Sequence, residues 1–308
     1  MHIRSGKVIK TQLRIQSENM EIMDKESSYS YLGVPTGFKI FPSATETIEQ
    51  LKKEVKSIDD SLLYPWQKFD AINTFITTKL SFHLKCGTVP KKSLNELDAL
   101  IKKVGKKWMN LPVTASCELL YLPYTAGGMN IIPTSVLCDI STVSHAFRLL
   151  TSNDRITQKL AYDSMKEVVQ RRIRKEPTME EIAQFYNGAS STNIPQLNTD
   201  VSSCWTKLRG AMRRLSSKMK ITFEPDVSKK KFNLIINKAA ATRFNVEAQL
   251  RDATRNYFKQ TLLAKPSQGR VYNVTAKILF RIISTVMEIS LDLLNGILFI
   301  VLVSILCL

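Results

Sequence analysis

Residues that build disulfide frameworks and zinc sites are scarce in this sequence. Its 308 residues include three histidines, which lie far apart, and five cysteines, none of which belongs to a Cys-x-x-Cys pair. An odd number of scattered cysteines argues against both a disulfide framework and a zinc site. It favours a reducing, intracellular compartment, either the nucleus or the cytoplasm. The first ten residues contain basic side chains but no apolar run, which is not typical of a secretory signal.

Motifs of catalytic and phosphate-binding sites are missing as well. No histidine stands beside a nucleophile in a recognised motif, and Gly127-Gly128 lacks the strand and helix context of a phosphate-binding loop, so we expect a tight turn there. Asp59-Asp60 is the one pair of adjacent aspartates. Because it ends an amphipathic stretch and does not lie between apolar strands, we expect solvated acids and not a metal-binding pair. The sequence predicts no catalytic residue, no metal site, no cofactor and no small-molecule substrate.

Acidic residues are too few to balance the basic ones. Lys and Arg number 44 against 27 Asp and Glu, which gives a formal net charge of +17. Residues 1–150 carry 19 basic and 14 acidic side chains, a net charge of +5, whereas residues 151–277 carry 24 and 11, a net charge of +13. Such an excess is typical of proteins that meet phosphate backbones or anionic surfaces. The middle-to-late part of the chain is therefore the candidate phosphate-facing surface.

The spacing of apolar residues predicts a mainly α fold with a little β structure at its start. Apolar and polar residues alternate roughly in the first forty positions, which predicts short strands. Steps of three and four between apolar residues follow and predict helices. The expected helices cover about 48–62, 66–84, 93–108, 133–152, 155–174, 178–187, 205–219 and 237–263. Ser93 with Glu96 has the spacing of a capping box, and Leu119–Pro123 is expected to form a short apolar strand.

Shifts in composition divide the chain into four parts. Residues 1–42 form the small β segment, and residues 43–186 form a helical domain. A polar segment, 187–199, is rich in Ser, Thr and Asn and marks a boundary. A basic helical region, 200–277, follows it, and an apolar tail, 278–308, ends the chain.

Cations gather on the polar faces of the helices in the basic region. Within 205–219 the apolar residues form one stripe, and no acid lies between Asp200 and Glu224. Solvated charge is the ordinary state of a surface helix, but phosphate-binding surfaces have this composition too. The candidate nucleic-acid-binding residues are Arg171, Arg172, Arg174, Lys175, Lys207, Arg209, Arg213, Arg214 and Lys218.

The tail contains 16 residues without a charge, from Leu293 to Leu308. As a helix these residues span about 24 Å, which is less than the ~30 Å hydrocarbon core of a bilayer. Extending the span to Ile282 brings in Glu288 and Asp292, which are costly near the bilayer centre. Three interpretations stay open: a membrane anchor, a helix packed on its own protein, and a chance extension of an interrupted reading frame.

Four segments resemble, in order and spacing, the end of the palm and the thumb of a non-LTR retrotransposon reverse transcriptase, most nearly of the ribosomal-DNA-inserting R-two clade. They are YSYLGVPTGF (29–38), SLLYPWQKFDAINTFITTKLSFHLKCGTVP (61–90), LNELDALIKKVGKKWMNLP (94–112) and LYLPYTAGGMNI (120–131). The resemblance covers about residues 20–155, and a looser likeness extends to Gln268-Gly269. It implies that 1–42 is a palm-like remnant and that 43–186 is thumb-like.

The same resemblance limits the function that it implies. In this family the catalytic aspartates precede the tyrosine-leucine-glycine strand, and no aromatic-x-Asp-Asp lies in the residues before Tyr31, so no catalytic residue is carried over. Tyr31, Leu32 and Gly33 correspond to a primer-grip-like strand. The chain is then expected to hold an RNA template and DNA through their backbones without polymerising. The alternative is a basic helical protein that the apolar tail anchors to a membrane.

Overall fold

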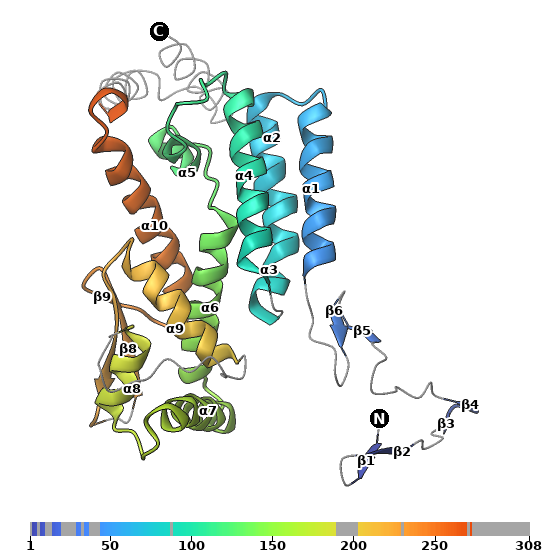
Figure 1. Ribbon diagram of the computed structural model, residues 1–308, viewed down its shortest axis with the longest axis vertical. Helices are drawn as coiled ribbons and strands as arrows, with labels where there is room; N and C mark the ends of the chain where they lie inside the picture. Colours follow the sequence, from blue (N-terminus) through green and yellow to red (C-terminus); the bar gives the residue numbers. More distant parts are fainter. Residues whose placement is uncertain are drawn as a thin grey trace.

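The computed structural model describes residues 2–4, 7–9, 14–19, 29–31, 34–36, 44–86, 89–188, 203–228, 231–269 and 272. These residues form a mainly α protein, as the sequence predicts (Figure 1). Leu32, Gly33, most of the boundary segment 187–199 and the whole apolar tail 278–308 lie outside the described residues. Tyr31 lies in a strand.

In the described part of the first forty residues, three two-stranded antiparallel hairpins precede the helices, which agrees with the short strands expected there. Their strands are β1 (His2–Arg4) with β2 (Lys7–Ile9), β3 (Arg14–Ile15) with β4 (Glu18–Asn19), and β5 (Tyr29–Tyr31) with β6 (Val34–Thr36). In the third hairpin Tyr31 pairs with Val34 across a two-residue connection.

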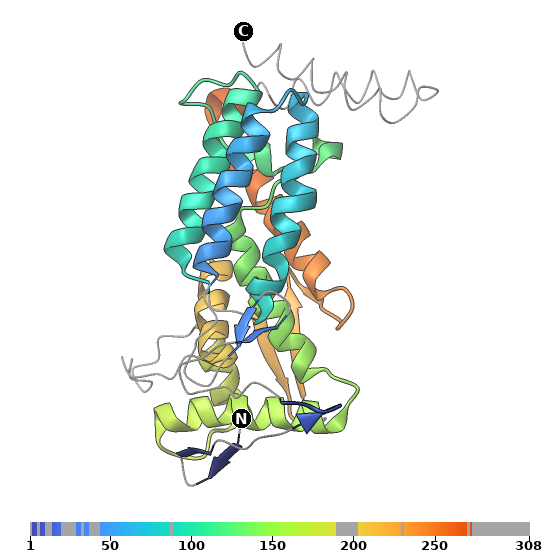
Figure 2. The ribbon, with the colours of Figure 1, turned by 90° about the vertical axis from the view of Figure 1, so that its right-hand side faces the viewer.

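The first part of the helical body consists of closely packed helices. They are α1 (Thr45–Asp60), α2 (Pro65–Ala71), α3 (Thr77–Cys86) and α4 (Lys91–Trp108). A π-helical turn, η1 (Ile72–Ile76), joins α2 to α3. The stripe Ile48, Leu51 and Val55 of α1 is buried, and α1 packs on α4. Figures 1 and 2 both show these helices side by side.

The helix α6 (Thr134–Leu150) lies at the centre of the body. It packs against α3 and α4 on one side and against α7, α9 and α10 on the other. Because it has neighbours in several directions, it buries polar as well as apolar side chains, among them Asp139, Ser141 and Ser144. A short helix, α5 (Glu118–Tyr121), and a 3₁₀ turn, η2 (Tyr124–Ala126), precede it.

The basic half combines helices with a small sheet. Its helices are α7 (Arg155–Ile173), α8 (Met179–Tyr186), α9 (Cys204–Ser216) and α10 (Val246–Leu263). The sheet has the antiparallel order β7 (Ile221–Asp226), β8 (Lys231–Ile236) and β9 (Ala239–Ala240). Ile221 pairs with Ile236 and Phe223 with Leu234, so one face of the hairpin is apolar and buried. The side chain of Asn187, at the end of α8, bonds to both the N–H and the C=O of Phe223.

Several local expectations are wrong. Leu119–Pro123 is not a strand, because residues up to Tyr121 form α5. Ser93 does not begin its helix, since α4 starts at Lys91 with Pro90 as N-cap. Leu62 is fully exposed beyond the end of α1.

The helix expected from residue 237 begins at Val246 instead. Asn237 and Lys238 both have positive φ, at 48° and 73°. They form the two-residue turn between β8 and β9, which requires this backbone conformation. Gly127 also has a positive φ, 73°, which confirms the tight turn expected at Gly127-Gly128.

Candidate nucleic-acid interface

The helix α9 presents the central part of the predicted basic surface. A capping box fixes its start, because the Ser203 hydroxyl accepts from the N–H of Thr206 at 3.1 Å and the Thr206 hydroxyl accepts from the N–H of Ser203 at 2.9 Å. Trp205, Leu208 and Met212 are buried beneath the helix. The basic residues of α9 are consequently displayed on its outer faces.

Two arginines meet at the ring of Phe185, which α8 contributes. The guanidinium carbon of Arg209 lies 4.3 Å from the centre of the ring, and that of Arg172, near the end of α7, lies 5.8 Å from it. Phe185 is 1% exposed, so the guanidinium groups and their neighbours shield it from water. Aromatic rings attract cations at these distances. The structure thus brings together residues that are 37 positions apart in the sequence.

Arg213 adds a third positive charge to this group. Burial lowers the pKa of Arg209, and the positive charges of Arg172 and then Arg213 lower it further. Burial also lowers the pKa of Arg172. Within the described ranges, neither Arg209 nor Arg213 makes an ion pair with a carboxylate. We refer to Arg172, Arg209 and Arg213 as the Phe185 arginine cluster.

Arg214, the next residue on α9, has a different environment. Its Nε lies 3.1 and 3.0 Å from the two carboxylate oxygens of Asp139, and its Nη2 lies 2.7 Å from Oδ1. Lys91 Nζ lies 2.7 Å from the same Oδ1. The hydrogen bonds to Asp139 raise the pKa of Arg214. The positive charge of Arg214 is therefore compensated within the protein.

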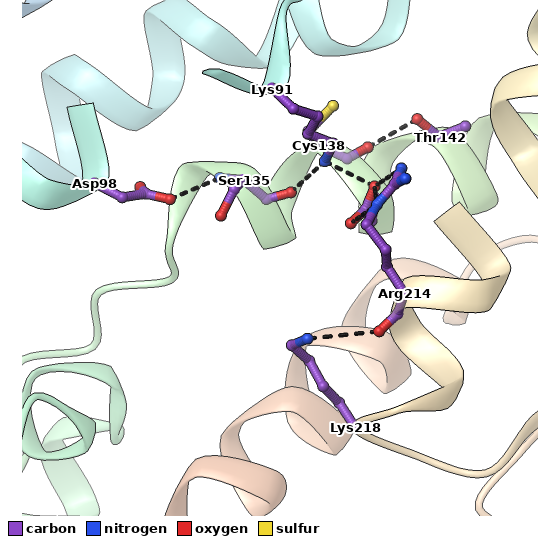
Figure 3. A network of polar contacts seen from close by, with 8 residues as sticks. Lys91, Asp98, Ser135, Cys138, Thr142, Arg214 and Lys218 are labelled. Atoms are coloured by element: carbon purple, nitrogen blue, oxygen red, sulfur yellow. Dashed lines mark hydrogen bonds and ion pairs between the residues drawn. The ribbon is translucent and has the colours of Figure 1, made fainter. Parts of the chain in front are cut away.

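This ion triad joins three helices. Figure 3 shows the Lys91 side chain of α4 and the Arg214 side chain of α9 reaching toward α6, which carries Asp139. Lys91 Nζ also donates to the Ser135 carbonyl at 2.6 Å. The Asp98 carboxylate of α4 accepts from the backbone N–H groups of Thr134 and Ser135 and so caps α6. Arg214 thus has a structural role in holding α9 to this framework.

The other predicted basic residues differ in the partners that surround them. Arg171 pairs with Glu167 at 2.5 Å, and Lys175 pairs with Glu181 at 2.5 Å. Arg174 ends α7 in the left-handed conformation and is exposed. Lys218 lies 5.9 Å from the Tyr257 ring. Lys207 is half-buried on α9. Leu32 and Gly33, the other two residues of the primer-grip-like strand, fall outside the described residues.

Sequence reasoning missed Phe185 and Asp139. Phe185 lies in α8, whose start carries the Thr178 and Glu181 capping box; that signal predicts the helix but not its contact with Arg209. Asp139 is one acid in an apolar stretch of α6, and a lone acid in a buried helix is a signal that a buried ion pair exists. Nothing in the local sequence names Arg214 as its partner.

Asp59 has a structural role rather than a solvated one, which corrects the sequence expectation. Its Oδ1 accepts from Trp108 Nε1 at 2.7 Å, and its Oδ2 lies 3.0 Å from Lys107 Nζ. These contacts tie the end of α1 to the end of α4. In the described part of the chain, no group of three or more His, Cys, Asp or Glu side chains has the arrangement of a metal site.

The membrane interpretation of the tail concerns residues beyond those described. Among the helices that the structure does describe, none is both long enough and apolar enough to cross a bilayer.

The chain is similar to two known proteins. It is 27% identical over 217 residues, 70% of its length, to an uncharacterized protein of Caenorhabditis elegans. It is 25% identical over 119 residues, 39% of its length, to the retrovirus-related Pol polyprotein from the type-1 retrotransposable element R2 of Popillia japonica. The chain spans 62% of the worm protein and 16% of the beetle polyprotein. No protein-family model matches it. These findings establish a partial similarity to a retroelement polyprotein.

Proposed function

We propose that this protein is a nucleic-acid-binding module related to the thumb end of a retrotransposon reverse transcriptase. In this proposal it holds a template and primer duplex of RNA and DNA through backbone phosphates and does not polymerise by itself. The partial similarity to a retroelement Pol polyprotein supports the relation. The whole polyprotein's activity is not carried over, because the match covers 16% of its length.

The observation that carries the proposal is the Phe185 arginine cluster. Arg172 and Arg209 meet at this shielded ring, and the like charges of Arg172 and Arg213 repel that of Arg209. An anion bound beside Arg209 and Arg213 relieves this repulsion, and their planar guanidinium groups suit the oxygens of a phosphate. By contrast, Arg214 already has its counter-charge in Asp139. The proposal therefore assigns phosphate contact to Arg209 and Arg213 and a structural role to Arg214.

A salt titration of binding tests this assignment. Each phosphate contact made on a duplex steepens the slope of log K against log salt by about 0.9. The double variant Arg209→Gln/Arg213→Gln is expected to weaken binding of an RNA–DNA hybrid and to make the slope shallower by about 1.8, as measured by fluorescence anisotropy.

The matched control is Lys53→Gln/Lys103→Gln, which removes two exposed charges from α1 and α4. It changes the net charge by the same amount, so an equal change in slope would show that only overall charge matters and would overturn the assignment.

Removing residues 278–308 is expected to leave the salt-sensitive affinity intact. Loss of nucleic-acid affinity with that truncation, together with loss of a membrane-bound fraction, would favour the membrane-anchored alternative.

A further inference from the structure

A second basic feature lies at the opposite end of α7 from the Phe185 arginine cluster. A cavity of about 320 Å³ opens between the first half of α7 and the start of β8. This volume is at the lower end of the range of small-ligand sites, ~300–1,000 Å³. The lining residues are Leu150, Arg155, Gln158, Lys159, Tyr162, Asp163, Lys231 and Phe232.

The charged residues of the cavity favour an anion. Arg155, Lys159 and Lys231 are exposed and, within the described ranges, make no ion pair. Asp163 is the one carboxylate among the lining residues. Three cations and one carboxylate leave a formal charge of +2 around the cavity. A phosphate group is the kind of ligand that two or three converging cations bind in proteins.

The apolar wall of the cavity favours a flat ring beside that anion. The rings of Tyr162 and Phe232 lie 6.2 Å apart, centre to centre, at an angle of 27° between their planes. Phe232 is buried, and it fixes the position of the half-buried Tyr162 ring. The Tyr162 hydroxyl makes no hydrogen bond to another described residue. Aromatic side chains next to cations are the usual means of binding a base together with its phosphate.

We propose that this cavity binds one unpaired nucleotide of a nucleic-acid strand. Its phosphate meets Arg155, Lys159 and Lys231, and its base lies against the Tyr162 ring. The inference rests on the proposed function and adds a single-stranded component to it. Lys159 and Arg172 are 13 residues apart on α7, which is about 20 Å along the helix. A duplex at the cluster therefore needs a single-stranded extension to reach the cavity.

The test compares blunt and extended duplexes. Anisotropy is measured with a short RNA–DNA hybrid that is either blunt or extended by about six nucleotides, since a strand advances about 3.4 Å per nucleotide in a duplex. Extensions on the 5′ and 3′ sides are both used. The favoured extension is expected to tighten binding about tenfold, the size of one base–aromatic stack. An extension of abasic nucleotides is expected to give little of this gain.

Variants of the cavity separate it from the rest of the surface. Tyr162→Ala is expected to remove the gain from the extension and to leave blunt-duplex binding unchanged. Because Tyr162 is partly buried, Lys231→Gln provides a second, exposed variant with the same expected outcome, and Lys103→Gln on α4 is the charge-matched control. Retention of the full gain in both cavity variants would overturn the inference.

Three further outcomes have distinct meanings. If the blunt duplex binds but no extension improves its affinity, the inference is wrong and the proposed function stands. If neither binds, the proposed function fails first. The thermal stability of the protein is also measured with a nucleoside 5′-monophosphate. If the mononucleotide stabilises the protein through Tyr162 but no extension tightens duplex binding, the cavity is a mononucleotide site and the strand proposal is overturned.

Discussion

The ion triad of Asp139, Arg214 and Lys91 yields the sharpest prediction for stability. Asp139→Ala removes a buried carboxylate that accepts two hydrogen bonds from the Arg214 Nε and Nη2 groups and pairs with Lys91. Breaking a fully buried ion pair costs about 3–5 kcal/mol, whereas an exposed pair is worth about 0–1 kcal/mol.

The exposure of Arg214 and Lys91 decides where the cost of losing Asp139 lies between the values for a buried and an exposed ion pair. The Arg214 side chain is 48% exposed and that of Lys91 is 32% exposed, so both regain some water when Asp139 is lost. We therefore expect Asp139→Ala to lower the free energy of unfolding by about 2–3 kcal/mol. Urea unfolding followed by circular dichroism measures this loss from the midpoint at constant slope.

The control is Asp252→Ala, which breaks the exposed pair of Asp252 with Arg255. It is expected to cost less than about 0.5 kcal/mol. An Asp139→Ala loss equal to that of the control would refute the claim that α9 is held to α6 by this carboxylate.

Three other predictions concern α1, the turn before α6, and catalysis. Burial raises the pKa of the Asp59 carboxyl, but the hydrogen bonds from Trp108 and Lys107 outweigh this effect and lower the pKa below the usual value. The ionised Asp59 therefore stabilises the fold above the unfolded-state pKa of ~3.9, and this stabilisation is lost as the pH falls through the folded-state pKa. Asp59→Asn should therefore destabilise the protein at pH 7, and the difference in unfolding free energy from the wild type should begin to shrink below about pH 4 and disappear only after the pH has passed below the lowered folded-state pKa. Gly128→Ala places a Cβ 2.3 Å from the Leu122 carbonyl oxygen and should cost more than about 2 kcal/mol in the same urea assay. Gly210→Ala places its Cβ 3.2 Å from the Arg214 side chain and should cost less, because a side chain shifts by a few tenths of an ångström more easily than the backbone. In a primer-extension assay with magnesium the chain alone should add no nucleotide; extension by purified protein would contradict the proposed function.

Helical periodicity predicted most of the fold because most of the core is made by amphipathic helices. Ile48, Leu51 and Val55 are buried as their spacing predicts. The short elements were not predicted. A short apolar run such as Leu119–Leu122 fits both a helix and a strand. The β7–β8 hairpin was missed although Ile221 and Phe223 alternate with polar residues, because the sequence between its strands, Val227 to Lys230, contains no Asn-Gly or Asp-Gly turn signal.

The turn at Asn237-Lys238 was missed for a different reason. Two-residue hairpin turns with positive φ usually contain glycine at the second position. Here Lys238 adopts a φ of 73°, so the most common sequence signal is absent. The antiparallel pairing of β8 with β9 on either side of the turn holds the lysine in this conformation.

Counting charges predicts that a surface is basic but not which cations remain available on it. Arg213 and Arg214 are adjacent in the sequence, yet successive residues of a helix point about 100° apart. Arg214 reaches Asp139, which is 75 residues earlier in the chain, and Arg213 turns away from it. No local pattern contains this information, because it depends on how α9 crosses α6.

Cations that already pair with a carboxylate reduce the salt dependence of nucleic-acid binding that the basic surface can produce. Of the nine predicted contact residues, Arg171, Lys175 and Arg214 each lie within 2.7 Å of a carboxylate oxygen. A phosphate that approaches any of the three also approaches that carboxylate and is repelled by it. At most six of the nine then contribute, which bounds the slope of log K against log salt for a blunt duplex at about −5 instead of about −8. A measured slope near −8 would mean that these ion pairs open on binding, and the separation of structural from phosphate-binding arginines would then fail.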